Sequence, residues 1–260
     1  MNECEYCLQT ETMLREQLGI DAAQWQLRVF EEIDSTNTEA KRMAADGFDG
    51  SALIVADRQT AGRGRMGRRF YSPKRTGAYF SVLYTPSAPL SNAVRITGAA
   101  AVAAMRAIRS LMGKQVGIKW VNDLYFNDKK IAGILAESVV SAEGTRVIVG
   151  IGINLCTADF PAEIASVAGS LNACALSPAQ LIAATVRELM PYLDDPQNRS
   201  WLDDYRRCST VLGKPIYWLY EGRRYDGVAT EIDDDGALIA MCKDGVQKRL
   251  STGEITVRLQ

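Results

Sequence analysis

The chain has 260 residues, of which 47% are apolar and 23% charged, and its net charge is −1. This length and composition are typical of a globular protein with one large domain, or with a large and a small one. The sequence contains neither a membrane-spanning run nor a secretory signal, so we expect a cytoplasmic protein with no membrane partner. Histidine is absent, which excludes imidazole-based catalysis. The six cysteines, with a single Cys4-x-x-Cys7 pair, predict neither a disulfide scaffold nor a metal site.

Helical and strand patterns alternate over most of the chain. Residues 33–46 are typical of a capped helix, with a glycine stop and N-cap candidates at Asp34, Ser35, Thr36 and Asn37. Helical spacing of apolar residues predicts two more helices, from Ser91 to Met112 and over 179–193. Apolar or alternating runs predict strands at 52–56, 78–84, 116–121, 131–138 and 146–155. This order is typical of an α/β or α+β domain.

The pattern changes near residue 210. Short strands are predicted at 216–220, 225–232, 237–242, 247–250 and 255–259, with turns rich in Asp and Gly between them. A run of short antiparallel strands predicts a small β-barrel beside the larger domain. We therefore expect two domains, residues 1–209 and residues 210–260.

Basic residues are concentrated between residues 58 and 122, which contain twelve Lys or Arg and no acidic residue. Four of the arginines lie in the loop Gly62-Arg-Gly-Arg-Met-Gly-Arg-Arg, where glycines let the backbone approach a ligand closely. The loop satisfies G-x-G-x-x-G, but Pro73 and Gly77 prevent the helix that a dinucleotide-binding turn needs, and the Lys-Ser/Thr of a P-loop is missing. The pattern predicts instead an acid-free hollow in which arginines pair with phosphate.

Two later segments also carry polar groups at strand positions. In Lys119-Trp-Val-Asn-Asp123, the two charged residues share one strand face. In the strand over 146–155, Gly150 and Gly152 share a face with Asn154, whose amide can bond to a nucleobase edge. Glycines on a strand face indicate close approach of a ligand or, equally, of a packed helix. Of the lysines at 129 and 130, one is expected in a solvated hairpin turn.

Five motifs together resemble the signature set of the biotin protein ligases in order and spacing. They are Asp34-Ser-Thr-Asn37, Gln59-Thr-Ala-Gly-Arg-Gly-Arg-Met-Gly-Arg68, Lys119-Trp-Val-Asn-Asp-Leu-Tyr125, Lys130-Ile-Ala-Gly-Ile-Leu-Ala-Glu137 and Gly150-Ile-Gly-Ile-Asn154. The segment from Gly236 to Ile255 is similar to the family's C-terminal domain. The resemblance implies an α/β catalytic domain related to class II aminoacyl-tRNA synthetases and lipoate ligases, followed by an SH3-like β-barrel.

The family resemblance implies an ATP-dependent ligase with two reactions. Biotin and ATP give biotinyl-5′-AMP and pyrophosphate, with Mg²⁺ on the phosphates, and a lysine of a biotin carboxyl carrier protein then takes the biotin. Carried over by motif, the biotin-binding residues are Ser35, Thr36, Asn37, Gln59, Gly62, Arg63 and Gly133. The residues assigned to ATP and the adenylate are Arg65, Arg68, Phe70, Lys119, Asn122, Ile153 and Asn154.

Three of the residues are assigned catalytic roles. Arg65 would cover the adenylate and prevent its escape, and Lys130 would bind first the biotin carboxylate and then the adenylate phosphate. Asp123 is our hypothesis for steering or deprotonating the acceptor lysine, whose free pKa near 10.4 keeps it mostly protonated at neutral pH.

The chain departs from the family pattern in three places. Val121 replaces a common proline, and Phe70 stands where tryptophan is frequent, which reduces the stacking area offered to adenine. About 30 residues, mostly acidic among the charged ones, precede the first motif, so we expect no winged helix and no DNA binding. The family often forms dimers, and a homodimer is therefore possible here.

Two other functions fit parts of the same pattern. A lipoate or octanoyl ligase uses the same adenylation chemistry, although the Gly-Arg loop and the C-terminal domain favour biotin. A nucleic-acid-binding module would explain the basic segment, but its arginines lie in a glycine loop without the exposed aromatic platform of such modules. Release of pyrophosphate that depends on ATP and biotin would distinguish the ligase from both.

Overall fold

The computed structural model of the protein describes residues 5–19, 25–87, 93–141, 144–251 and 256–259. Its larger part is a seven-stranded sheet in which β1 and β2 are parallel and the other neighbouring strands antiparallel, in the order β1-β2-β3-β7-β6-β5-β4. The strands are β1 (Trp25–Ile33), β2 (Ser51–Gln59), β3 (Gly77–Tyr84), β4 (Gly117–Lys119), β5 (Asp123–Phe126), β6 (Lys129–Ser141) and β7 (Gly144–Asn154).

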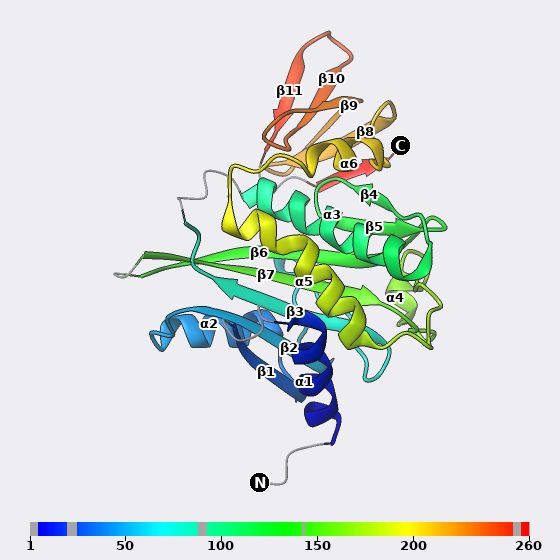
Figure 1. Cartoon of the computed structure of the whole chain (residues 1–260). Helices are drawn as coiled ribbons and strands as arrows, with labels where there is room; N and C mark the ends of the chain where they lie inside the picture. Colours follow the sequence, from blue (N-terminus) through cyan, green and yellow to red (C-terminus); the bar gives the residue numbers. More distant parts are fainter. Residues whose placement is uncertain (1–4, 20–24, 88–92, 142–143, 252–255, 260) are drawn as a thin grey trace.

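Helices cover both faces of this sheet (Figure 1). On one face α3 (Ala93–Met112) and α5 (Pro178–Asp194) lie side by side, and α1 (Glu5–Leu18) packs beside α5. On the other face α2 (Thr36–Ala45) packs on β2, β3 and β7. Because both faces are covered at the centre, every residue of β3 is buried, whereas the sequence pattern indicated an alternating strand. No described helix is long and apolar enough to cross a membrane.

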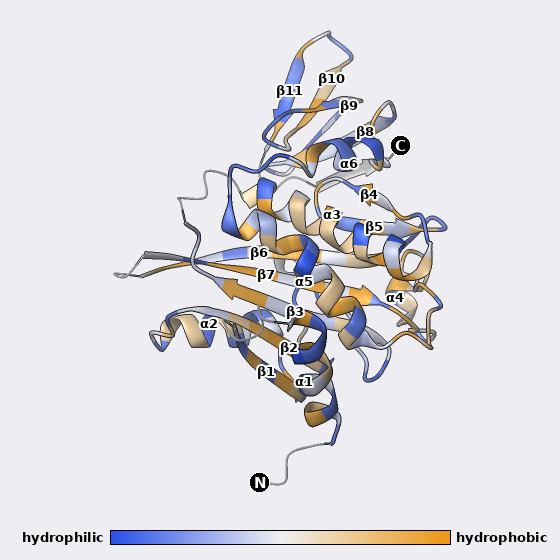
Figure 2. Cartoon of the chain, viewed as in Figure 1, coloured by the Kyte–Doolittle hydropathy of each residue, from blue (hydrophilic) through white to orange (hydrophobic). Residues whose placement is uncertain are grey.

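The C-terminal part is a five-stranded antiparallel sheet in the order β11-β10-β9-β8-β12. Its strands are β8 (Pro215–Tyr220), β9 (Arg223–Ile232), β10 (Leu238–Cys242), β11 (Gln247–Leu250) and β12 (Thr256–Leu259). It lies beyond β4 and α6 (Leu202–Arg207), and its outer strand β11 is hydrophilic (Figures 1 and 2). The predicted α/β domain with a small all-β C-terminal domain is confirmed, but the described strand pairings leave an open sheet and do not close a barrel.

Several boundaries differ from those expected. The predicted strand over 116–121 ends at Lys119, because the chain turns at 120–122 and returns as β5. Lys119 and Asp123 are therefore partners across a hairpin, not neighbours along one strand. The elements α1, β1, β5, α6 and the short α4 (Ala162–Ala165) were not predicted. The proposed helix start at Ser91, Cys4 and the strand start at Ile255 lie outside the described residues.

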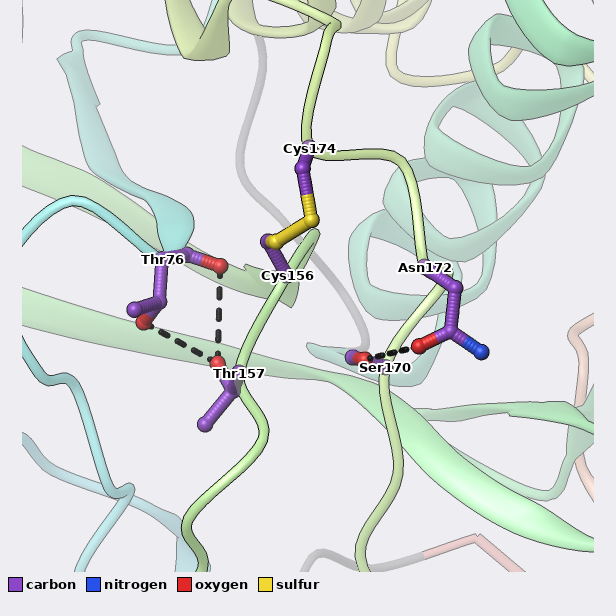
Figure 3. The surroundings of a disulfide bond; sticks show 6 residues. All are labelled: Thr76, Cys156, Thr157, Ser170, Asn172 and Cys174. Atoms are coloured by element: carbon purple, nitrogen blue, oxygen red, sulfur yellow. Dashed lines mark hydrogen bonds between the residues drawn. A yellow bond between two sulfur atoms is a disulfide. The ribbon is translucent and has the colours of Figure 1, made fainter.

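A disulfide joins Cys156, just after β7, to Cys174 in the loop before α5 (Figure 3). Next to it, the Thr157 hydroxyl donates to Thr76 Oγ1 at 3.0 Å. The sequence predicted no disulfide scaffold, and this single bond was not foreseen, because a separation of 18 residues matches no recognisable spacing. The bond closes the loop 156–174, which forms one wall of the site described below.

Candidate active site

A cavity opens on the α2 face of the central strands, and glycines form its floor. Gly133 of β6 and Gly152 of β7 are direct cross-strand partners, so two side chains are missing at adjacent positions. A methyl group at Gly152 would lie 2.5 Å from the Phe70 ring, and one at Gly150 would lie 1.8 Å from Asn37 Oδ1 of α2. Of the two alternatives for these glycines, Gly150 therefore accommodates a helix, and Gly152 accommodates an aromatic ring of the cavity wall.

The Gly-Arg loop between β2 and β3 forms the cavity roof. Backbone hydrogen bonds close this loop. Phe70 N donates to Gly62 O at 2.9 Å, and Gln59 N donates to Ser72 O at 3.1 Å. Gly62 is required by this closure, since a methyl group there would lie 2.5 Å from Phe70 O. The closed loop places four arginines along the cavity, namely Arg63, Arg65, Arg68 and Arg69.

One end of the cavity is lined by neutral hydrogen-bonding groups. Gln59 Oε1 accepts from the backbone N–H of Thr36 at 2.9 Å and from its hydroxyl at 3.2 Å. Ser35 caps α2, since its hydroxyl oxygen accepts from the Thr38 N–H. Ser81 Oγ lies 2.7 Å from Thr36 Oγ1. These hydroxyl and amide groups hold one another in fixed orientations, which suits recognition of a small polar ring.

Asn37 lies in the same wall, but its amide is used by the protein. Its Nδ2 donates to Glu137 Oε2 at 3.0 Å and to Leu135 O at 3.3 Å, and its Oδ1 lies 2.7 Å from Ser81 Oγ. Glu137 also pairs with Arg63 at 2.9 Å and with Lys41 at 2.8 Å. Asn37 and Glu137 thus tie α2 and the Gly-Arg loop to β6. The sequence analysis gave Glu137 no role of its own.

The opposite side of the cavity is formed by the β4–β5 hairpin and the start of β6. Lys130 Nζ lies 2.6 Å from Asp123 Oδ1, and both side chains are mostly buried. Arg65 Nη1 donates to Asn122 Oδ1 at 2.8 Å, while Asn122 Nδ2 donates to Ile134 O at 2.9 Å. Burial lowers the pKa of Arg65, and the charge of nearby Asp123 opposes that shift. The protein's own contacts thus hold these charged groups in place.

A second cavity adjoins the first beyond Phe70 and is more apolar. Its wall contains Tyr71, Phe160, Ile164 and Val167. Asn154 Nδ2 donates to Gly169 O at 2.9 Å, while its buried Oδ1 has no hydrogen-bond partner among the described residues. A buried acceptor without a donor is costly, so this atom is suited to a ligand N–H.

The loop 156–174 supports both Asn154 and Lys130. Lys130 N donates to Val167 O at 2.8 Å, and Gly169 N donates to Lys130 O at 2.9 Å. The Lys129 ammonium donates to the carbonyl groups of Ala165 and Ser166 in the same loop. The sequence had predicted that one of the two lysines would lie in a solvated turn, whereas Lys129 is bonded to the protein. The aromatic and aliphatic residues of this loop were missed, because no periodicity or spacing in the sequence marks them.

Most residues that the sequence analysis selected line the first cavity. They are Ser35, Thr36, Asn37, Gln59, Arg63, Arg65, Arg68, Phe70, Lys119, Asn122, Asp123, Lys130 and Gly133. Asn154 lies in the second cavity, and Gly62 lies inside the loop closure. Ile153 is buried in the core with the residues that α3 and α5 cover, so strand alternation directs its side chain away from both cavities.

The cavity is strongly basic but not acid-free. Among the described residues that line it, one is acidic, Asp123, and six are basic, namely Arg63, Arg65, Arg68, Arg69, Lys119 and Lys130. The expectation of a hollow without carboxylates is therefore wrong, because the hairpin brings Asp123 to Lys130 from outside the basic segment. The excess of positive charge still favours a ligand with phosphate groups. The two adjoining cavities thus offer neutral hydrogen-bonding groups, a cluster of positive charge and an apolar wall.

Comparisons with known proteins found matches over most of the chain. Two family models match, the biotin/lipoate A/B protein ligase family over residues 29–154 and the biotin protein ligase C-terminal domain over residues 211–258. A biotin–[acetyl-CoA-carboxylase] ligase of Paracoccus denitrificans is 35% identical over 223 residues, which cover 79% of this chain and 90% of the relative. The bifunctional ligase/repressor BirA of Bacillus subtilis is 33% identical over 235 residues, which cover 83% of this chain and 69% of the relative.

A solved structure is similar over nearly the whole chain. It is the biotin protein ligase from Aquifex aeolicus in complex with biotin and ATP, with a TM-score of 0.76 and 26% sequence identity. The match covers 90% of this chain and 99% of that structure, so it includes both sheets.

Proposed function

This chain belongs to the biotin protein ligase family, and from that premise we propose that its two joined cavities are where it activates biotin with ATP and transfers biotin to a carrier protein. The observation that carries the proposal is the position of the charged groups. Arg65, Lys130 and Asp123 meet between a neutral polar end and an apolar end with a free buried acceptor. Biotin and ATP, which the Aquifex aeolicus ligase binds, have complementary parts.

We propose that biotin occupies the polar end. Its ureido ring would bond to Ser35, Thr36 and Gln59, whose groups are already oriented there, and its carboxylate would lie on Lys130. Gly133 would let the ligand lie against the backbone of β6, and Gly62 and Arg63 would hold the roof. Asn37 contributes by fixing α2 and not through a free amide group.

The nucleotide would occupy the second cavity. Phe70 would stack over the adenine, and the unpartnered Oδ1 of Asn154 would accept from its amino group. Arg68 and Lys119 line both cavities and would contact phosphates. Ile153 would contribute only its backbone.

The first reaction is a displacement at phosphorus. An oxygen of the biotin carboxylate attacks the α-phosphate, the bond to the β-phosphate breaks, and pyrophosphate leaves. Two anions must approach one another, so lysine and arginine charges fixed beforehand lower the barrier without reorganising. This step requires no proton transfer, in agreement with the absence of histidine.

In the second reaction the acceptor amine attacks the carbonyl carbon of the mixed anhydride, and AMP leaves. The amine must lose a proton before or during attack, and Asp123 is the only carboxylate among the described residues lining the first cavity. We propose that Asp123 is freed for this task when Lys130 turns from it to the adenylate phosphate.

Magnesium is expected with ATP, and its source of ligands is the next question for the site. Among the described residues no three His, Cys, Asp or Glu side chains gather, and Asp123 is paired with Lys130. We propose that the ion arrives bound by phosphate oxygens, as Mg²⁺ commonly does.

The acceptor is proposed to be the biotin carboxyl carrier protein of a biotin-dependent carboxylase, as the name of the Paracoccus denitrificans relative indicates. We also propose that the protein is cytoplasmic, does not bind operator DNA, and can pair into a homodimer through a sheet edge such as β1. The division into residues 1–209 and 210–260 is likewise proposed, since the first sheet precedes this boundary and the second follows it.

Mass spectrometry tests the function directly. A purified carrier domain is incubated with the protein, biotin, ATP and Mg²⁺, and parallel reactions contain lipoate or octanoate instead of biotin. We expect the mass of one biotinyl group on one lysine, only when biotin and ATP are both present. Modification by lipoate or octanoate alone would contradict the proposed substrate, and no modification with any acid would contradict the function.

A further inference from the structure

The turn between β4 and β5 is held from behind by two groups outside the cavity. Tyr205 of α6, which is 1% exposed, donates its hydroxyl hydrogen to Val121 O at 2.9 Å. The indole N–H of Trp120 donates to Gly236 O, in the turn between β9 and β10, also at 2.9 Å. Each bond is buried, so water does not replace it when it is lost. The C-terminal sheet and α6 thus both contact the segment that carries Asn122 and Asp123.

Tyr205 is itself rigidly placed. Its ring packs edge to face against the Trp201 ring, with 5.4 Å between the two ring centroids. The Trp201 ring fills the space over two glycines, since a methyl group at Gly98 would lie 2.5 Å from it and one at Gly236 would lie 2.9 Å from it. The chain after α6 pairs with β4, with Ile118 N donating to Cys208 O at 2.8 Å. Helix α6 cannot shift without disturbing this packing.

The 120–122 turn in its turn positions Arg65, through Asn122. Asn122 accepts from the Arg65 guanidinium, and it is fixed on β6 by its Nδ2 and by its backbone oxygen, which accepts from Ile134 N at 2.9 Å. Burial raises the pKa of Tyr205, and the positive charge of Arg65 opposes part of that increase. A displacement of Val121 would therefore move Arg65 through a single intervening residue, Asn122.

We propose that Tyr205 is a positioning residue, whose hydrogen bond to Val121 fixes the 120–122 turn so that Asn122 holds Arg65 closed over the adenylate. This rests on the proposed function, in which Arg65 retains the adenylate. Helix α6, whose residues line neither cavity, thereby helps to keep the intermediate from escaping.

The test compares Tyr205→Phe with the wild type and with Tyr192→Phe. The control removes the same hydroxyl from another buried tyrosine, whose oxygen accepts from Arg106 at 2.9 Å on the α3–α5 side of the sheet. Each protein forms adenylate from biotin and α-labelled ATP without carrier, at a temperature well below its own unfolding transition. Gel filtration then measures the rate at which labelled adenylate leaves the protein, and the KM for biotin is measured by pyrophosphate release.

We expect adenylate to leave Tyr205→Phe about tenfold faster than wild type, with a biotin KM within about twofold, because one buried hydrogen bond is lost behind Arg65 only. Tyr192→Phe should retain adenylate like the wild type. Unchanged release from Tyr205→Phe would overturn the proposal, and so would equal leakage from both variants, which would indicate general loosening. A wild type that forms no adenylate would contradict the proposed function itself, and the positioning role with it.

Discussion

Gly133 offers the sharpest test of the cavity floor. In Gly133→Ala the new methyl group would lie 3.4 Å from both Lys130 Nζ and the Phe70 ring, which is ordinary contact. The folded protein should therefore accept it, and alanine restricts the unfolded chain, so we expect an unchanged or slightly higher melting temperature. A ligand lying against the strand would meet the methyl group. Overpacking of this kind costs about 1–3 kcal/mol, so biotin affinity should fall about 5- to 150-fold.

Two neighbouring glycines serve as comparisons. Gly150→Ala would place its methyl group 1.8 Å from Asn37 Oδ1 and should lower stability, because α2 must move. Gly152→Ala would place its methyl group 2.5 Å from the Phe70 ring and should weaken the binding of ATP more than the binding of biotin. Calorimetric titration with biotin and thermal unfolding of each variant distinguish these effects. If Gly133→Ala bound biotin as tightly as wild type with the same melting temperature, the ligand would not lie on this floor.

Three further predictions concern other parts of the structure. Cys174→Ser opens a loop of 18 residues and should lower the unfolding free energy by about 3 kcal/mol under non-reducing conditions, with no difference from wild type in excess dithiothreitol. Asp123→Asn should slow transfer from preformed adenylate to the carrier, and transfer at the wild-type rate would exclude the proposed proton role. Burial raises the pKa of Asp204, but its bond and ion pair with Arg106 outweigh this and lower it below 3.8. The ionised form is thus favoured by folding, so Asp204→Asn should destabilise at neutral pH by about 1.5–3 kcal/mol, and the loss should vanish as the pH falls below 3.8.

Local signals made much of the site predictable. Ser35 was recognised as a candidate cap, and the Gly-Arg loop was recognised because glycines and arginines alternate within a few residues. The alternation in β7 correctly separated Gly150 and Gly152 from the core-facing residues. Each of these features is decided within one strand, helix or loop.

The unpredicted features depend on contacts between distant segments. Tyr205 meets Val121 across 84 residues, and Cys156 meets Cys174 only because the loop between them folds back. Asn122 was assigned to adenine, and in the structure its Oδ1 accepts from Arg65 while its Nδ2 donates to Ile134 O. Residue type alone does not reveal whether an asparagine binds a ligand or another side chain, since the same donor and acceptor serve both.

Asp123 is the one carboxylate among the described residues that line the basic cavity, and it is better understood as part of the proposed chemistry than as an obstacle to phosphate binding. A cavity with six basic residues and no acid would hold phosphate strongly, but it would repel the protonated amine that must arrive next. In the proposed mechanism, Asp123 would remove part of that repulsion where the amine must enter, and its contact with Lys130 at 2.6 Å would link the two steps. An anion that drew Lys130 away would expose the carboxylate when the adenylate has formed. The Lys130–Asp123 pair can therefore favour the binding of a phosphate first and of an amine second, because each ligand changes the charge that the next ligand meets.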